Sequence, residues 1–165
     1  MDDPRTSAYL REPRFLGGGG GLVSTAHDYL RFCRMLLGGG AFQGTRVLSP
    51  LAVEKMTSPA SPDLETNTRG LGWDIDSAFS SNRGELLPVG SFGHTGFTGT
   101  SIWIDPVTGM FVIFLSNRVH PDGKGDVTPL RARVATVAAA AMTSLPAPSQ
   151  ARAGVWTGRD FGASG

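Results

Sequence analysis

The sequence is poor in the features that mark several classes of protein. Lysine occurs at two of its 165 positions and cysteine at one, and 15 Lys and Arg against 14 Asp and Glu leave a net charge of +1. One thiol cannot form an internal disulfide, and a nearly neutral chain without a basic run offers no electrostatic surface to nucleic acid or anionic lipid. No apolar run approaches the roughly 20 residues that cross a bilayer. Residues 1–15 contain no apolar signal segment.

Residues that could hold a cofactor are also sparse. The histidines His27, His94 and His120 are dispersed, and none has an acidic partner at helical spacing, so we expect no metal site. The glycine run at 17–21 lacks the Lys-[Ser/Thr] ending of a phosphate-binding loop. It is interpreted as a flexible loop before a helix, and no cofactor is expected.

Three segments have helical patterns. Thr25 is placed to cap a helix whose apolar stripe falls at Ala26, Leu30, Cys33 and Leu37 and which ends at the glycines 38–40. A second helix is expected from the Ser49-Pro50 pair to just before Pro59. The polar residues 58–70 are expected to be a surface connection. A final helix is predicted with Thr128 as its cap and Pro129 at its start, and its buried stripe is expected at Leu130, Val134, Val137, Ala138 and Ala141.

From residue 70 to residue 117 the apolar residues alternate with period two, as in strands. Strands are expected within 70–76, 91–95, 99–105 and 110–117, with a hairpin loop at 106–109. The last of them is almost uninterruptedly apolar, which predicts a strand buried on both faces in the interior of the sheet. The predicted fold class is α/β (α+β), a mostly antiparallel sheet with the last helix on one face and the two earlier helices beside it.

Several segments occur together in a characteristic order: GGGGLVSTAHDYLRFCRMLLGGG, VLSPLAVEKMTS, GLGWDID, FGHTGFTGTSIWIDP and FLSNRVHP. From about Phe15 to Leu145 the chain resembles the C-terminal half of the serine hydrolases related to class C β-lactamases and D-Ala-D-Ala peptidases, a group that includes family VIII esterases. The resemblance implies a partial β-lactamase/transpeptidase-like fold. It also implies that residues 1–145 are the C-terminal portion of the hydrolase domain. Pro146 is expected to stop the last helix, and residues 146–165 are interpreted as a linker and tail or the start of a further domain.

The resemblance assigns functional residues at one motif. His94-Thr95-Gly96 matches the family's Lys-Thr-Gly or His-Thr-Gly triplet, which implies that His94 and Thr95 contact the substrate and that Gly96 allows its close approach. The backbone N–H of Phe97 would then be an oxyanion-hole donor, a group worth about 3 kcal/mol of transition-state stabilisation. On the pattern alone, the same residues also fit a Gly-rich turn between two strands, with His94 incidental.

Histidine at position 94 bears on the substrate. An imidazole is mostly neutral at neutral pH, whereas lysine is charged. A neutral ring binds a carboxylate weakly, so we expect a small ester or peptide rather than a β-lactam, although the resemblance admits all three.

The nucleophile of such enzymes is missing. They attack with the serine of a Ser-x-x-Lys motif, but Ala52 and Pro121 stand three positions before the two lysines. The family's second motif is Tyr-x-Asn or Ser-x-Asn, and Ser80-Ser81-Asn82 fits it formally. The family places this motif well upstream of the GGGGLVST segment, whereas Ser80-Ser81-Asn82 lies just before His94, so it is interpreted as incidental. No Gly-x-Ser-x-Gly elbow is present either.

The chain is therefore interpreted as part of a hydrolase that works through an acyl-serine intermediate, inactive by itself. A non-catalytic peptide- or glycopeptide-binding module and a non-functional truncated fragment stay open as alternatives. Proteins of this bacterial family are often periplasmic or attached to the cell envelope, and the sequence leaves the location open.

Overall fold

A computed structural model describes residues 5, 10–12, 14–15, 17, 22–62 and 67–145 of the chain. The predicted tail at 146–165 lies outside the described residues. In chain order the elements are α1 (Ala26–Leu37), β1 (Ala41–Phe42), β2 (Thr45–Arg46), α2 (Pro50–Thr57), β3 (Thr68–Arg69), β4 (Asp74–Asp76), the 3₁₀ helix η2 (Ser80–Arg83), β5 (Phe92–Thr95), β6 (Ser101–Ile104), β7 (Phe111–Phe114) and α3 (Thr128–Ala140).

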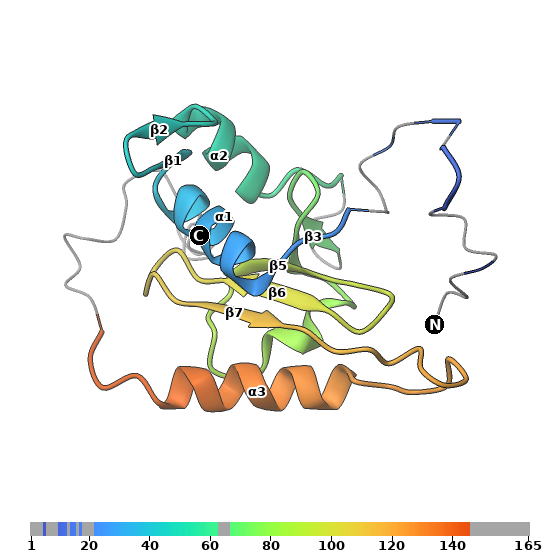
Figure 1. The fold of residues 1–165 in the computed structure, drawn as a ribbon. Coiled ribbons are helices and arrows are strands. Elements are labelled where there is room, and N and C mark those ends of the chain that lie inside the picture. The colour runs from blue at the N-terminus through green and yellow to red at the C-terminus, as the bar shows by residue number, and fades with distance from the viewer. Residues whose placement is uncertain are drawn as a thin grey trace.

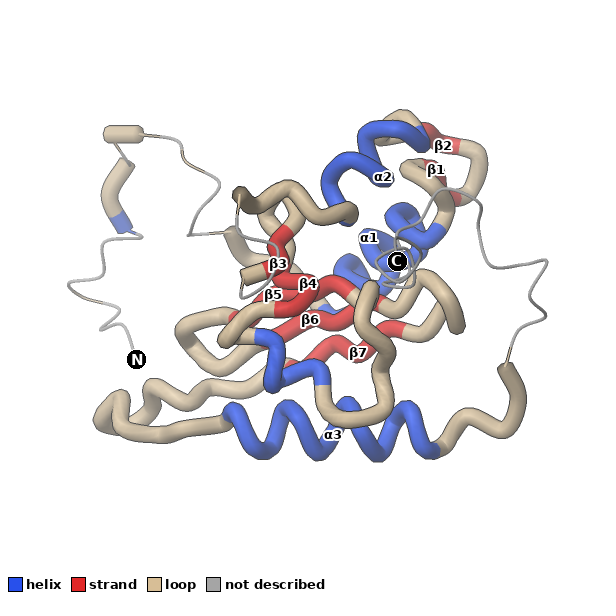
Figure 2. Tube along the Cα trace, turned by 180° about the vertical axis from the view of Figure 1, so that it is seen from behind, coloured by secondary structure: helices blue, strands red, loops and turns tan. Residues whose placement is uncertain are grey.

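The centre of the fold is a five-stranded antiparallel sheet in the order β3-β4-β5-β6-β7. Figure 1 shows α3 along one face of this sheet and α1 and α2 on the other side. The view from behind shows the same arrangement, with η2 between the sheet and α3 (Figure 2). The predicted fold class, an antiparallel sheet flanked by helices, is confirmed.

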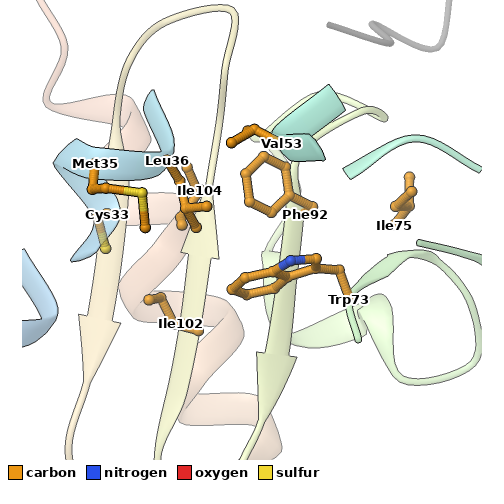
Figure 3. Close-up of a cluster of buried hydrophobic side chains, with 9 residues drawn as sticks. All are labelled: Cys33, Met35, Leu36, Val53, Trp73, Ile75, Phe92, Ile102 and Ile104. Atoms are coloured by element: carbon orange, nitrogen blue, oxygen red, sulfur yellow. The ribbon is translucent and has the colours of Figure 1, made fainter. Parts of the chain in front are cut away.

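The alternation of side chains along the strands separates two cores. On the α1 face, Phe92, Ile102 and Ile104 join the buried residues of α1 in the larger cluster. Figure 3 shows the side chains of Met35 and Leu36 directed from the helix toward these strands. On the α3 face, the neighbouring Trp103 packs with Ala135 of the last helix. His94 pairs in register with Ile102 and therefore shares the α1 face.

The signals for the starts of the first two helices are confirmed. The Thr25 hydroxyl accepts a hydrogen bond from the Asp28 N–H at 3.2 Å, and the Ser49 hydroxyl accepts one from the Ala52 N–H at 3.1 Å. Each side chain satisfies a backbone donor that a helix N-terminus leaves without an intrahelical partner. After α1, Gly39 takes a φ of +61°, which a glycine adopts without steric cost.

Cys33 belongs to the core of the α1 face, as expected. Its side chain is fully buried, and burial raises the pKa of its thiol to about 12. Because the thiolate is the reactive form, we expect Cys33 in the native chain not to react with a thiol reagent at pH 8 and to react fully in denaturant. Absorbance after addition of a chromogenic disulfide reagent measures both states, and rapid stoichiometric labelling of the native chain would contradict the prediction.

The prediction for the most buried strand was wrong. All four residues of β6 are buried, whereas all four residues of β7 are partly exposed. β7 occupies the end of the sheet, with β6 as its one strand neighbour among the described residues. A continuous apolar run therefore does not distinguish a strand at the end of this sheet from one in its centre.

The predicted buried stripe of α3 was also wrong. Leu130 and Val137 are exposed, and the buried residues of the helix are Arg131 and Ala135. Thr128 lies inside the helix, and its N–H donates to the Asp126 carboxylate at 2.8 Å, so Thr128 is not the side-chain cap. The helix therefore turns the face that carries Arg131 and Ala135 toward the sheet, and not the face that carries Leu130 and Val137.

The polar segment 58–70 was predicted to be a surface connection, but near its end it contributes a strand to the sheet. Thr68 and Arg69 form β3, which pairs with β4. The strand predicted over 70–76 is shorter, since Leu71 is exposed and regular pairing begins at Asp74. β3 places Arg69 within reach of His94 on β5 and of Asp74 on β4.

Candidate active site

The His94-Thr95-Gly96 string lies at the rim of a pocket of about 470 Å³. The string forms the end of β5 and the residue after it. Thr25, the N-cap of α1, and Tyr29 in its first turns also line the pocket. The other lining residues are the apolar Leu22, Val23, Ile102, Ile113 and Leu115 and the hydroxyl-bearing Ser24, Thr98, Thr100 and Ser101. None of the lining residues in the described part of the chain is Asp, Glu, Lys or Arg. A pocket of this composition suits an uncharged organic group.

Gly96 has a packing role inside the chain. A Cβ at this position would collide with the hydroxyl oxygen of Thr100, and the Gly96 N–H donates to the Thr100 carbonyl at 2.6 Å. Glycine therefore lets the two ends of the turn between β5 and β6 approach closely. This requirement adds to the close approach of substrate that the resemblance implies.

Arg131 holds this turn from the α3 face. Its guanidinium donates from Nη2 to the carbonyls of Gly96 and Thr100, both at 2.8 Å, and from Nε to the carbonyl of Gly99 at 3.4 Å. Nη1 donates to the Asn82 side chain at 3.4 Å. One side chain thus fixes three carbonyl groups of a five-residue segment.

The remaining carbonyls of the turn are held by residues that follow β7. The Arg118 Nε donates to the Phe97 carbonyl at 2.6 Å, and the Arg118 N–H donates to the Thr98 carbonyl at 2.9 Å. Ser116 donates its hydroxyl to the Gly99 carbonyl at 2.8 Å. Every carbonyl from residue 96 to residue 100 accepts a hydrogen bond, so the backbone of the turn is fixed in one orientation.

The fixed carbonyls determine where the Phe97 N–H points. The Gly96–Phe97 peptide bond is trans, and in a trans peptide the N–H lies opposite the carbonyl of the preceding residue. Since the Gly96 carbonyl faces Arg131, the Phe97 N–H is directed away from it. No acceptor for this N–H is found within the described residues. Within the described part of the chain, this donor thus has no partner, and Phe97 lies in sequence between the pocket-lining residues Gly96 and Thr98.

Arg131 is a buried cation without a carboxylate partner. Its side chain is 6% exposed, and it forms no ion pair with any residue that the structure describes. Burial, followed by the nearby charge of Arg118, lowers the pKa of Arg131. The hydrogen bonds to the turn offset the cost of desolvating this charge.

The ring of His94 is held at both nitrogens. Nδ1 lies 2.7 Å from the carbonyl oxygen of Thr95, and Nε2 lies 3.3 Å from Nη2 of Arg69. Arg69 in turn pairs with Asp74, with 2.7 Å between its Nη1 and the carboxylate Oδ1.

Sequence reasoning missed both Arg69 and Arg131. Arg69 stood in a segment interpreted as a connection, and Arg131 stood on a helix whose apolar stripe was expected elsewhere. Neither arginine stands in a motif or spacing that marks it as part of a site.

Ser80-Ser81-Asn82, interpreted as incidental, lies in η2 and does not line the pocket. Its Asn82 accepts from Arg131 and donates to the Phe79 carbonyl at 3.0 Å. The described residues contain no group of three or more His, Cys, Asp or Glu that could hold a metal ion. None of the described helices is both long enough and apolar enough to cross a membrane.

Comparison with known proteins identifies the family. The sequence model of the beta-lactamase family matches residues 1–136. The chain belongs to the beta-lactamase family. Its place in the superfamily of β-lactamase-related serine hydrolases agrees with the resemblance carried by the ordered segments.

Two relatives in Salmonella illustrate the similarity. A protein of Salmonella gallinarum named "Putative D-alanyl-D-alanine carboxypeptidase" is 34% identical over 107 residues, which are 64% of this chain and 24% of that protein. A protein of the same name from Salmonella paratyphi B is 33% identical with the same coverage. The matched part of the chain thus spans about a quarter of the length of these curated relatives.

A solved structure supports the fold. The chain is similar to a beta-lactamase from Mycobacterium bovis with a TM-score of 0.53 and 24% sequence identity, over 70% of this chain and 44% of that one. The antiparallel sheet between helices is therefore the beta-lactamase family's fold in the part that the two chains share.

Proposed function

We propose that this chain is the oxyanion-binding side of a serine hydrolase whose acyl-serine nucleophile lies on a part of the domain that this sequence does not contain. The observation that carries the proposal is the orientation of the Phe97 N–H. Arg131 holds the Gly96 carbonyl toward α3, whereas the pocket opens among α1 and the ends of β5, β6 and β7. The N–H opposite that carbonyl therefore points to the pocket side of the sheet.

The chemistry needs a donor of this kind. When a serine attacks an ester or amide carbonyl, negative charge develops on the carbonyl oxygen, and a donor fixed in advance stabilises that charge without reorganisation. Hydrogen bonds at all five carbonyls supply the rigidity. His94 and Thr95 would contact the substrate beside the reacting carbonyl, and Gly96 would keep the strand end free of a side chain.

The pocket supports a small neutral acyl compound as the substrate class. The described lining residues carry no ionic side chain, and Ile102, Ile113 and Leu115 form an apolar wall. Esters and peptide bonds present an uncharged carbonyl to such a wall. The name of the Salmonella relatives points instead to a peptide ending in D-alanine, whose C-terminal carboxylate would find no lysine or arginine among the described lining residues.

A chimera tests this proposal. The 107 matched residues of the Salmonella gallinarum protein would be replaced by those of this chain, and the product treated with a fluorophosphonate, which phosphonylates activated serines. We expect one labelled serine, located by mass spectrometry in the Salmonella part, together with hydrolysis of p-nitrophenyl acetate. The 165-residue chain alone is expected to show neither. A chimera that folds by circular dichroism but is neither labelled nor active would contradict the proposed function, provided that the parent protein is labelled.

A further inference from the structure

The two contacts of the His94 ring select one tautomer. A carbonyl oxygen cannot donate a hydrogen bond, so the 2.7 Å contact with the Thr95 carbonyl requires a proton on Nδ1. A guanidinium cannot accept one, so the 3.3 Å contact with Arg69 requires Nε2 to be the acceptor and to carry no proton. Both contacts together describe a neutral imidazole with its proton on Nδ1.

Arg69 is itself fixed by a buried carboxylate. Asp74 is 1% exposed, and its Oδ1 accepts from Arg69 at 2.7 Å and from the Ser77 hydroxyl at 2.8 Å. Its other oxygen has no hydrogen-bond partner within the described residues. Moving Arg69 away would leave a buried carboxylate without its counter-ion, which is costly. The arginine is thereby held where its second nitrogen reaches His94.

We propose that Arg69, anchored by Asp74, is the positioning residue of His94 and holds its ring as the Nδ1–H tautomer. The catalytic relevance of this rests on the proposed function, since His94 borders the pocket where the acyl group would react. Arg69 and Asp74 are neutral as a pair, so they orient the ring without adding net charge. The site would then offer a neutral ring of fixed orientation to the substrate, which fits an uncharged ester or peptide better than a carboxylate.

Nitrogen-15 NMR of the imidazole rings in the 165-residue chain tests the inference without any turnover. Long-range proton–nitrogen spectra at pH 8, where histidine side chains are ordinarily neutral, separate protonated from unprotonated ring nitrogens. The signals that disappear in His94→Gln identify the His94 ring. We expect its Nε2 at the downfield position of an unprotonated nitrogen and its Nδ1 at the upfield position of a protonated one.

Variants assign the effect to Arg69. In Arg69→Met combined with Asp74→Asn, which leaves no buried charge unpaired, we expect the two nitrogen signals to move toward each other as the ring exchanges between tautomers. Arg69→Lys keeps a cationic donor and is expected to retain most of the original pattern. Arg83→Met combined with Asp76→Asn removes the neighbouring ion pair, whose Nη2 and Oδ1 lie 3.2 Å apart, and is expected to leave His94 unchanged.

Two results would overturn the inference: a native ring protonated mainly on Nε2, or an unchanged pattern in the Arg69→Met, Asp74→Asn chain. Neither result would affect the serine labelling of the chimera, so failure of this inference and failure of the proposed function can be distinguished.

Discussion

Replacing Arg131 by methionine is expected to lower the free energy of unfolding of the chain by about 2–3 kcal/mol, because hydrogen bonds from a charged group contribute about 1.5–3 kcal/mol each and relief of the buried charge returns part of the loss. Methionine occupies a similar volume and donates no hydrogen bond, so the contacts to Gly96, Gly99 and Thr100 are lost together. Urea unfolding followed by tryptophan fluorescence measures the change.

Arg133 provides the matched control. It lies on the same helix and is exposed, so Arg133→Met is expected to change the stability by no more than about 0.5 kcal/mol. Amide hydrogen exchange in the Arg131 variant should accelerate most between residues 96 and 100, since these are the residues that the guanidinium holds. Equal stability of the two variants would show that the turn does not depend on Arg131.

Removal of the Phe97 N–H is expected to reduce kcat of an active chimera by about 10²- to 10³-fold, the usual effect of deleting one oxyanion-hole donor. Phe97→Pro makes this change, since proline has no backbone N–H. It also restricts the preceding residue to extended conformations, which Gly96, the residue after β5, can adopt because glycine accepts a wide range of backbone angles. Ester hydrolysis under saturating substrate measures kcat.

Phe97→Ala separates the backbone from the side chain. It keeps the N–H and removes a ring that is 79% exposed and whose centroid lies 4.4 Å from the Arg118 guanidinium. An exposed cation–π contact is worth about 0.5–1 kcal/mol, so kcat should change by severalfold at most. A comparable loss in the alanine and proline variants would assign the effect to the ring and contradict the oxyanion role of the N–H.

The parts of the fold that could be predicted from the sequence depend on local chemistry. Thr25 and Ser49 marked helix starts because a hydroxyl at that position satisfies a nearby backbone donor. The strand that carries His94 was predicted from the period-two pattern that begins at residue 70. The place of His94 beside the substrate was implied by the family resemblance.

The parts that could not be predicted depend on tertiary neighbours. An apolar segment such as 111–114 reads alike at the edge and in the centre of a sheet, and its place depends on which strands pair with it. Arg131 was left out of the predicted buried stripe, and its burial depends on the turn after β5, whose carbonyls accept its hydrogen bonds. Arg69 on β3 reaches His94 on β5 across the one intervening strand, β4, a contact that sequence spacing does not reveal.

The most direct measurement is a crystal structure of the chimera after reaction with the fluorophosphonate. The phosphonyl group bound to the serine imitates the tetrahedral transition state, and one of its oxygens occupies the oxyanion position. The account predicts this oxygen about 2.7–3.1 Å from the Phe97 backbone nitrogen, with the Gly96 carbonyl on Arg131. A phosphonyl oxygen held by other donors, with the Phe97 N–H facing solvent, would contradict it.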